Sequence, residues 1–482
     1  MNTSRTFLLA KQTFKATIKQ RSFFILWLIF LILLIYAGTT GHHQTKAQNE
    51  MMHTYQDYAR KSWLDNPDKH PHRMAHFGSF AFRIRHPLSF FDFGMENYAG
   101  SIVFLEAHKQ NSVNFSEASF STGLLRLGEM SIAMLLQTLL PLIIFFLGFN
   151  SIAADRENGT LKILVSQGAG VRTILFGRAV GLWILSSLFF IPAFLITVTL
   201  LLTHNAIDGS QPLSRLSLIF LSYTIFYWII AMVAVSVSAS SMTARSALVK
   251  LLGIWIVFAM VLPRLVQVVS NEMYPSPTKL SFESAIEEDI LKQGDSHNPD
   301  DAFFRSLRDS VLAKYNVDSV HKLPFNYGGL VGKASERLSS ETYVRHQDRL
   351  TQLHRRQNNV AKSMSWINPF MMIKSSSMSL AGSDFEAYVN FQQQAEAYRY
   401  ELAQKMNDLQ MEFVSNIRPS GGTHSLHIDK EHWSGLKDFD YKYLSLKDIF
   451  KMEMSSVAAM IFWLVLSFIL LMSVSKQIKI IG

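Results

Sequence analysis

Six long apolar blocks constrain this chain more than any other feature of its sequence. About 20 consecutive apolar residues cross the hydrocarbon core of a bilayer, because each helical residue rises about 1.5 Å and the core is about 30 Å thick. Core helices of soluble proteins rarely stay uncharged over such a length or apolar on every face. We therefore expect six transmembrane helices in the 482 residues, at blocks 23–37, 132–149, 174–202, 216–237, 247–269 and 457–474.

The first block has features of both a signal peptide and a retained anchor. Four basic residues precede its apolar stretch: Lys11, Lys15, Lys19 and Arg21. The following sequence, YAGTTGHHQ, offers no convincing small-residue cleavage site. We interpret the block as a signal-anchor helix that is retained.

Basic residues alternate between the two sides of the six blocks. They lie before the first block, between the second and third, between the fourth and fifth, and after the sixth, whereas loop 203–212 has no Lys or Arg. Because Lys and Arg in short loops mark the cytoplasmic side, both termini are predicted to be cytoplasmic. Long loops translocate largely regardless of charge. The expected divisions are 1–40 (N-terminus and first span), 41–130 (outer), 131–269 (second to fifth spans), 270–453 (outer) and 454–482 (last span and C-terminus).

The composition narrows the possible functions. The chain has no cysteine, so its outer segments must be held by an ordinary core or by a partner rather than by disulfides. The net charge of +9 is a weak sign of nucleic-acid binding, because much of the excess lies in the loops assigned to the cytoplasm, and we expect no nucleic-acid partner. The spans have almost no ionisable side chain at mid-depth, which disfavours an ion-coupled carrier. No catalytic constellation stands out, so we expect the chain itself to be non-catalytic.

Histidines are densest in the first outer segment, where His70, His72, His76 and His86 lie close together in sequence. On a helix, His72 and His76 would share one face and could ligate a metal ion. Pro71 argues against a helix upstream, Gly78 follows closely, and the pair lacks the internal Glu of a metalloprotease motif. Structural histidines are therefore the simpler interpretation, with a metal site at His70, His72 and His76 as the alternative.

The second outer segment has the pattern of long helices separated by breaks. We expect helices from Ser281, over 301–315, over 331–363 after a turn at LPFNYGG, over 384–411, and a short amphipathic helix at 445–453. Residues 417–440 are predicted to form loop or short strand. The fold is therefore expected to be mainly α.

The segment between the second and third blocks, FNSIAADRENGTLKILVSQGAG (149–170), has an ordered charge pattern rather than scattered basic residues. Its stretch ADRENGTLKILVSQGAGVRTILFGRAVG resembles the signature of ABC-2 type transporter permeases, in which an acidic-basic-acidic-x-Gly-Thr-Leu-basic segment follows the second span. Arg178 stands where relatives usually carry Lys, and Asp155 where many carry Glu, so both charges are kept. The matching positions are Asp155, Arg156, Glu157, Gly159, Thr160, Leu161 and Lys162.

Three further stretches resemble one subgroup of these permeases, which carries a domain of unknown function and a large, split outer region. They are residues 66–100, 323–329 and 367–399. The resemblance implies a six-helix transmembrane permease of the ABC-2, type V exporter-like kind, with a large, mostly helical extracytoplasmic domain built from two insertions. It also implies location in the bacterial cytoplasmic (inner) membrane and export as the direction of transport.

The same resemblance implies partners. Permeases of this family work with two ATPase subunits and with a second permease, either an identical copy or a related chain. ATP and Mg²⁺ would bind to the ATPase, so we expect no cofactor in this chain; membrane lipid would surround the spans.

In this family the ATPase docks on a short coupling helix, which we expect at about residues 154–168. Asp155 can cap the helix start, where acidic side chains suit the positive end of the helix dipole. Leu161, Leu164 and Val165 offer an apolar contact face, while Gly168 and Gly170 permit the return to the membrane. The coupling set is Asp155, Arg156, Glu157, Gly159, Thr160, Leu161, Lys162 and Leu164.

Other functions remain open beside a permease. Met134, Phe145 and Phe146 are guesses for the substrate path, and the apolar spans lean weakly towards a lipid-like, peptide-like or otherwise amphiphilic cargo. A membrane metalloenzyme would use His70, His72 and His76. A receptor would sense a ligand with the outer domain.

Overall fold

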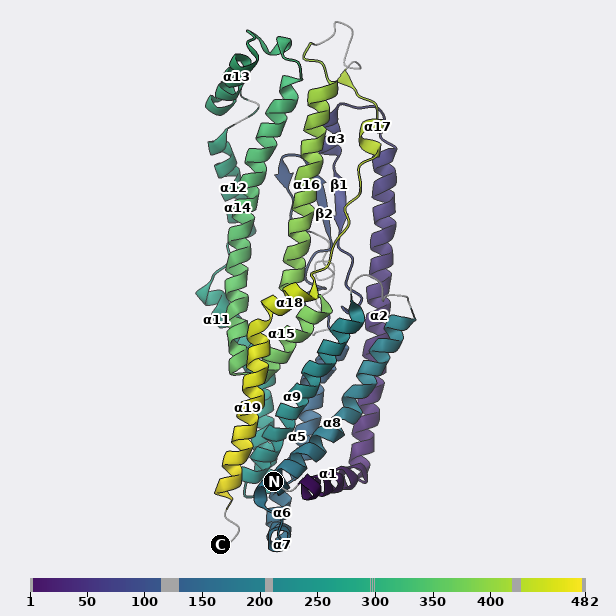
Figure 1. The fold of residues 1–482 in the computed structure, drawn as a ribbon, viewed down its shortest axis with the longest axis vertical. Coiled ribbons are helices and arrows are strands. Elements are labelled where there is room, and N and C mark those ends of the chain that lie inside the picture. The colour runs from purple at the N-terminus through teal and green to yellow at the C-terminus, as the bar shows by residue number, and fades with distance from the viewer. Residues whose placement is uncertain are drawn as a thin grey trace.

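The computed structural model describes residues 3–113, 130–203, 211–294, 296, 298, 300–417 and 426–478. It is elongated, with a helical bundle at one end and, at the other, a second part that we call the outer domain after the sequence expectation (Figure 1). Among the described residues, six helices are long and apolar enough to cross a membrane, and each contains one predicted block. They are Arg21–Leu64, Ile132–Glu157, Val171–Leu202, Pro212–Ser240, Ala244–Met273 and Met454–Gln477. The chain is therefore mainly helical with six candidate membrane spans.

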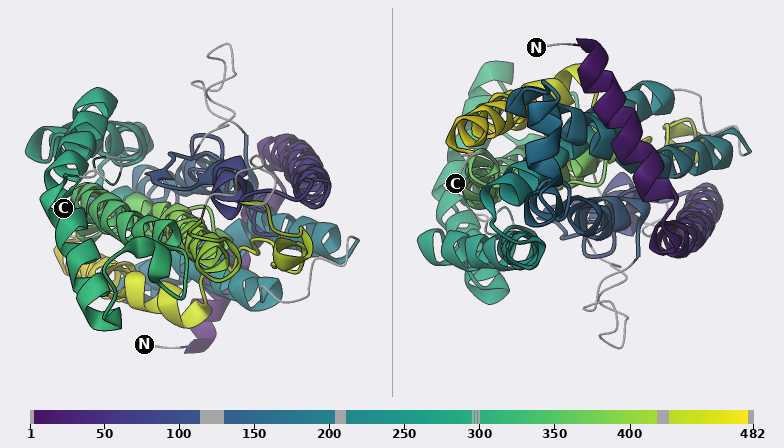
Figure 2. Two further views of the ribbon diagram at one scale, coloured as in Figure 1. Left: turned by 90° about the horizontal axis from the view of Figure 1, so that it is seen from above. Right: turned by 90° about the horizontal axis from the view of Figure 1, so that it is seen from below.

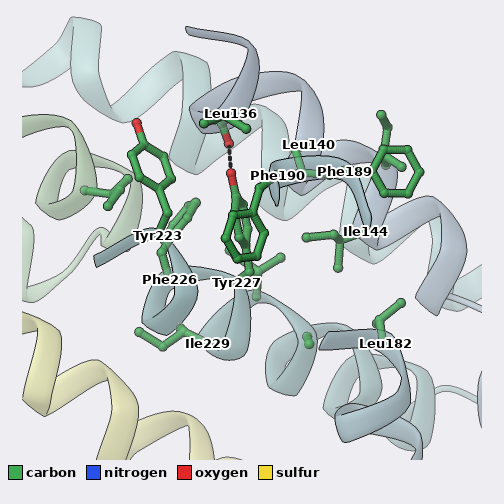
Figure 3. Close-up of a cluster of buried hydrophobic side chains, with 14 of the residues drawn as sticks. Leu136, Leu140, Ile144, Leu182, Phe189, Phe190, Tyr223, Phe226, Tyr227 and Ile229 are labelled. Atoms are coloured by element: carbon green, nitrogen blue, oxygen red, sulfur yellow. Dashed lines mark hydrogen bonds between the residues drawn. The ribbon is translucent and has the colours of Figure 1, made fainter. Parts of the chain in front are cut away.

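Helix α9 (Pro212–Ser240) forms the centre of the bundle and packs against α8 (Val171–Leu202), α5 (Leu140–Gly148) and α19 (Met454–Gln477). Aromatic side chains fill this core, and Figure 3 shows Phe190 from α8 beside Tyr227 from α9. The outward faces of the bundle are also apolar, with Phe24, Ile32 and Leu195 about half exposed or more. An apolar surface this extensive indicates contact with lipid or with another chain.

Two spans contain a π-helical turn. The second span begins with α4 (Ile132–Met134), η3 (Leu135–Leu139) and α5, and the fifth comprises α10 (Ala244–Trp255), η4 (Ile256–Val261) and α11 (Leu262–Met273). Wide turns disturb the regular backbone hydrogen bonds, and side chains from neighbouring helices bond the affected carbonyls. The donors are Tyr227 Oη to Leu136 O at 2.9 Å (Figure 3), Trp255 Nε1 to Thr138 O at 2.9 Å and Asn368 Nδ2 to Phe258 O at 2.8 Å.

The first span continues without a break into the outer domain. Helix α2 (Arg21–Leu64) has 44 residues, a length of about 66 Å at about 1.5 Å per residue. This is about twice the thickness of a bilayer core. The expected boundary near residue 40 therefore lies inside a helix rather than at a change of element. Before it, α1 (Thr3–Ile18) crosses the end of the bundle, as the view from below in Figure 2 shows.

Helices from the second outer segment dominate the outer domain. They are α12 (Lys279–Gln293), α13 (Ala302–Tyr315), η5 (Val320–Lys322), α14 (Tyr327–Ser363), α16 (Phe385–Phe413) and α17 (Glu431–Ser434). Two helices begin earlier than predicted. Thr278, not Ser281, caps α12, and Asn326 accepts a bond from Gly329 N, so part of the expected turn LPFNYGG opens α14.

A small antiparallel sheet, which the sequence did not lead us to expect, covers one side of α16. In the described part of the chain its strands are β1 (Ser79–Phe82), β2 (Ile102–Glu106) and β3 (Lys109–Gln110), in that order. Ser79 pairs with Leu105 and Phe82 with Ile102. Helix α3 (Pro71–Phe77) precedes the sheet and also packs on α16.

Helix α15 (Pro369–Ala381) belongs to the second outer segment in sequence but packs against α9 and α19. Its Phe370 meets Phe226 of α9 with ring centroids 5.5 Å apart. Segment 270–453 is therefore not purely an outer domain, because this part of it joins the core of the bundle. The one-turn helix η6 (Met364–Trp366) precedes α15, and α18 (Leu446–Met452) leads into the last span.

Candidate functional site

The turn between the second and third spans forms two short helices rather than the single helix expected at about 154–168. They are α6 (Ala153–Glu157) and α7 (Thr160–Ser166), joined through Gly159. Gly159 has φ 72°, a left-handed conformation that is costly for residues with a Cβ atom. A Cβ placed there would meet no described atom within 4 Å. Gly159 is thus required for the backbone angle and not for space.

The start of α6 is held by a side chain from another helix. Its N-cap position is the apolar Ile152, so Asp155 does not cap it as expected. Instead, Ser238 Oγ of α9 accepts hydrogen bonds from Ile152 N and Ala153 N, both at 3.1 Å, and donates to Phe149 O at 2.7 Å. The turn is therefore anchored on the central helix of the bundle.

The two charged residues that precede Glu157 also bind neighbouring spans. Arg156 donates to Ala239 O at 2.7 Å and to Ser241 O, at the C-terminal end of α9, where a cation complements the helix dipole. Asp155 forms an ion pair with Arg178 of α8 at 2.7 Å. Both side chains of this pair are largely buried. Asp155 and Arg156 thus connect the turn to the two spans that form most of the core.

The outward face of the turn differs from the expected one. Leu161 is only 4% exposed and packs in the bundle core, with Leu164 and Val165 partly buried against it. The exposed residues include Glu157, Thr160, Lys162 and Ile163. Ile163 is 55% exposed and is the apolar side chain that a partner could contact. Helical spacing grouped Leu161, Leu164 and Val165 correctly, but spacing alone does not say which face of a helix is buried.

Helix α1 locks against the same end of the bundle. Gly177 and Gly181 of α8 allow a close approach, because a Cβ on Gly181 would lie 2.8 Å from Ala10 O. Arg5 donates to Gly168 O after α7, and Arg178 donates to Thr13 Oγ1 at 3.2 Å. The spacing of the two glycines, GRAVG, was a readable signal for tight helix packing that we had not used.

The three residues guessed for a substrate path do not form one surface. Phe145 is buried in the core at 1% exposure, while Met134 and Phe146 are 40% and 47% exposed. These positions do not define a path within one chain.

At the opposite end of the molecule, the histidines lie differently from the predicted set. His72 and His76 share one face of α3, and His108, at the turn between β2 and β3, completes a group whose ligand atoms lie within 4.8 Å of one another. His70 instead caps α3 by accepting a bond from His72 N at 3.2 Å. Pro71 opens the helix at a position where its missing N–H costs nothing.

His86 lies elsewhere. Its Nδ1 accepts a bond from Leu88 N at 3.1 Å, and its ring packs against Tyr443. No sequence pattern links His108 to the α3 pair, because it is more than thirty residues away and follows a strand.

A buried network of charged side chains contacts His108. Arg399 of α16 donates to Glu336 of α14 at 2.6 Å and to Glu396 at 2.7 and 2.8 Å. Glu336 also accepts from the backbone N–H of His108 at 2.8 Å. Burial alone would raise the pKa of Glu336, but the bonds from His108 and the charge of Arg399 lower it to about 2. Glu336 is therefore an anion at neutral pH.

Six candidate spans joined to a helical domain are typical of a multi-span membrane protein. Residues 279–442, less than half of the chain, match the family model described as a domain of unknown function (DUF3526), so the chain carries a DUF3526 domain. The matched region extends from α12 past α17 and includes α15, Glu336 and Arg399. No curated protein matches the chain.

Proposed function

We propose that the chain is the membrane permease subunit of an ATP-binding cassette transporter of the ABC-2 type, acting as an exporter or moving its own outer domain. The observation that supports this most is the α6–α7 turn. It presents a small, solvent-exposed face while its other side chains bind the ends of two spans. Such a turn can receive a push from a partner and pass it to the membrane helices.

The path of that push would run through buried polar contacts. A partner that pressed on Ile163 or Thr160 would move α7, and α7 is joined to α6 through Gly159. Asp155 and Arg156 would then transmit this movement to α8 and α9 through short hydrogen bonds. Because charge-assisted bonds in partly buried sites are stronger than neutral ones, these connections suit transmission rather than simple solvation.

The arrangement of the ends supports one orientation. The described part of the N-terminal helix, the α6–α7 turn and the end of α19 gather at one end of the bundle (Figure 1), where the basic segments of the sequence also lie. By the positive-inside rule this end would face the cytoplasm of a bacterium. Two ATPase subunits carrying ATP and Mg²⁺ would dock there, and a second permease, identical or related, would complete the path.

The direct test uses Glu157→Lys and Gly159→Pro in the chain coexpressed with its ATPase. Glu157 is exposed, so its charge reversal should weaken ATPase association without harming folding. Pro cannot adopt φ 72° and would remove the Gly159 N–H bond to Arg156 O, so it should uncouple hydrolysis from transport. Glu412→Lys, also an exposed charge reversal but at the opposite end, is the matched control. If no ATPase associates with the wild-type chain, the proposal fails.

An amphiphilic cargo remains the proposal for the substrate. The described spans are rich in aliphatic and aromatic side chains, which supports a lipid-like or apolar peptide-like cargo. Stimulation of ATP hydrolysis by candidate cargoes in reconstituted lipid would identify it. Stimulation only by small hydrophilic ions would contradict this class of cargo.

A further inference from the structure

Three histidines from two separate elements converge at the outer domain. His72 and His76 come from α3, and His108 comes from the β2–β3 turn. The ring centroids of His72 and His76 lie 4.7 Å apart, and those of His108 lie 5.5 and 5.4 Å from them. We propose that His72, His76 and His108 bind one divalent transition-metal ion of the zinc type, whatever the chain transports.

The local backbone holds these side chains in place. His70 caps α3 and Pro71 starts it, so His72 and His76 sit four residues apart on one helical face. Ala107 N donates to Ala75 O at 3.2 Å, which joins the β2–β3 turn to the middle of α3. His108 itself has φ 64°, an uncommon conformation for a residue with a side chain. Such conformations persist where the surroundings impose them, and they concentrate at functional sites.

A buried carboxylate orients His108. Glu336 Oε2 lies 3.2 Å from His108 Nδ1 and accepts its backbone N–H. A carboxylate on one ring nitrogen fixes the tautomer of a metal-binding histidine and leaves the other nitrogen for the ion. Because Nδ1 is the ring nitrogen of His108 that lies beside Glu336, Nε2 is the nitrogen that we expect to bind the ion. Arg399 holds Glu336 in turn, at 2.6 Å.

The ligand type and spacing select the class of ion. Imidazole nitrogens bind Zn²⁺ and its transition-metal neighbours, whereas Mg²⁺ prefers oxygen ligands. Nitrogens on a tetrahedral ion are roughly 3.3 Å apart, because each metal–nitrogen bond is about 2.0–2.1 Å. The ligand atoms here lie within 4.8 Å of one another, so the widest pair would have to close by at most about 1.5 Å. His76 is an exposed side chain.

Three protein ligands leave one coordination position for water or another donor. This is the pattern of sites that exchange ligands, whereas structural zinc sites use four protein ligands. The ion would therefore be able to bind a small donor molecule at the outer surface.

The test measures Zn²⁺ binding to the full-length chain, purified in detergent without a polyhistidine tag, by competition with a chromogenic chelator. The wild type should bind one equivalent per chain, and Mg²⁺ should not compete. His76→Ala changes an exposed side chain, so it should fold normally and lose at least tenfold in affinity. His108→Ala should lose as much. Glu336→Gln should weaken binding about 10–100-fold, the usual effect of removing such a carboxylate.

His53→Ala, an exposed histidine on α2, is the matched control and should bind as the wild type does. Each variant is checked for a single gel-filtration peak. Absence of Zn²⁺ binding by the wild type, or unchanged affinity in both His76→Ala and His108→Ala, would overturn the proposal. An equal loss in His53→Ala would also overturn it, because the binding would then be nonspecific.

Discussion

Replacing Arg399 by leucine should destabilise the helices of the outer domain by about 3–5 kcal/mol, the usual cost of removing one partner from a buried ion pair. Arg399 donates to Glu336 and twice to Glu396, and to the carbonyl of Glu106 at 3.0 Å. The three charged side chains are at most 9% exposed. Without the guanidinium, two desolvated carboxylates would face each other with no cation between them.

Hydrogen exchange of the α16 amides measures this effect where it occurs. If α14 and α16 open together, a loss of about 3–5 kcal/mol corresponds to exchange roughly 10²–10⁴-fold faster, since about 1.4 kcal/mol is tenfold. The control is Arg337→Leu on α14, because its ion pair with Glu341 is 3.9 Å long, with the two side chains 57% and 65% exposed. Such pairs contribute about 1 kcal/mol or less.

A double variant tests the cause of the loss. Arg399→Leu combined with Glu396→Leu removes one of the two stranded carboxylates, so it should be less destabilising than Arg399→Leu alone. The reasoning is refuted if Arg399→Leu exchanges within threefold of Arg337→Leu, or if the double variant is the more unstable.

Three further predictions concern the packing of α1 on α8, the turn at Gly159, and the interface between the bundle and the outer domain. Gly181→Leu should push Ala10 and the rest of α1 away from α8. With one cysteine introduced on each helix of this cysteine-free chain, the yield of the α1–α8 disulfide should fall. Gly159→Ala should strain the turn by about 1–2 kcal/mol, and Gly159→Asn by less, because Asn tolerates positive φ. Transport per ATP hydrolysed should therefore fall more in Gly159→Ala than in Gly159→Asn, and equal losses would contradict this reasoning. Burial raises the pKa of Asp92, despite bonds from Ser377 and Gln137, so the folded state favours the protonated form. Its stabilising effect is then complete below the ordinary aspartate pKa and lost as pH rises through the raised value, and Asp92→Asn should flatten this part of the melting-temperature profile.

The sequence predicted the spans well because their signal is local. Each block is long and uncharged enough to be recognised without knowing its neighbours. Helices α12, α13, α14, α16 and α18 were also predicted to within a few residues, although the caps Thr278 and Asn326 moved two starts. Helices α15 and α3 were not predicted, and Pro71, which we took as evidence against a helix, instead begins α3. The small sheet was missed because its strands have only two to five residues, and short runs carry little periodic signal.

The candidate sites were likewise predicted in part by the sequence and decided in part by the tertiary structure. Sequence alone showed that His72 and His76 would share a face if they lay on a helix, although Pro71 was taken to disfavour one, and it singled out the charged turn around Gly159 by its order of residues. Only the tertiary structure brought His108 to that pair, turned Leu161 inward and exposed Ile163. The physical reason is that spacing specifies which side chains share a face, whereas the direction of the face, and the distant residue that meets it, depend on packing between segments that are far apart in the chain.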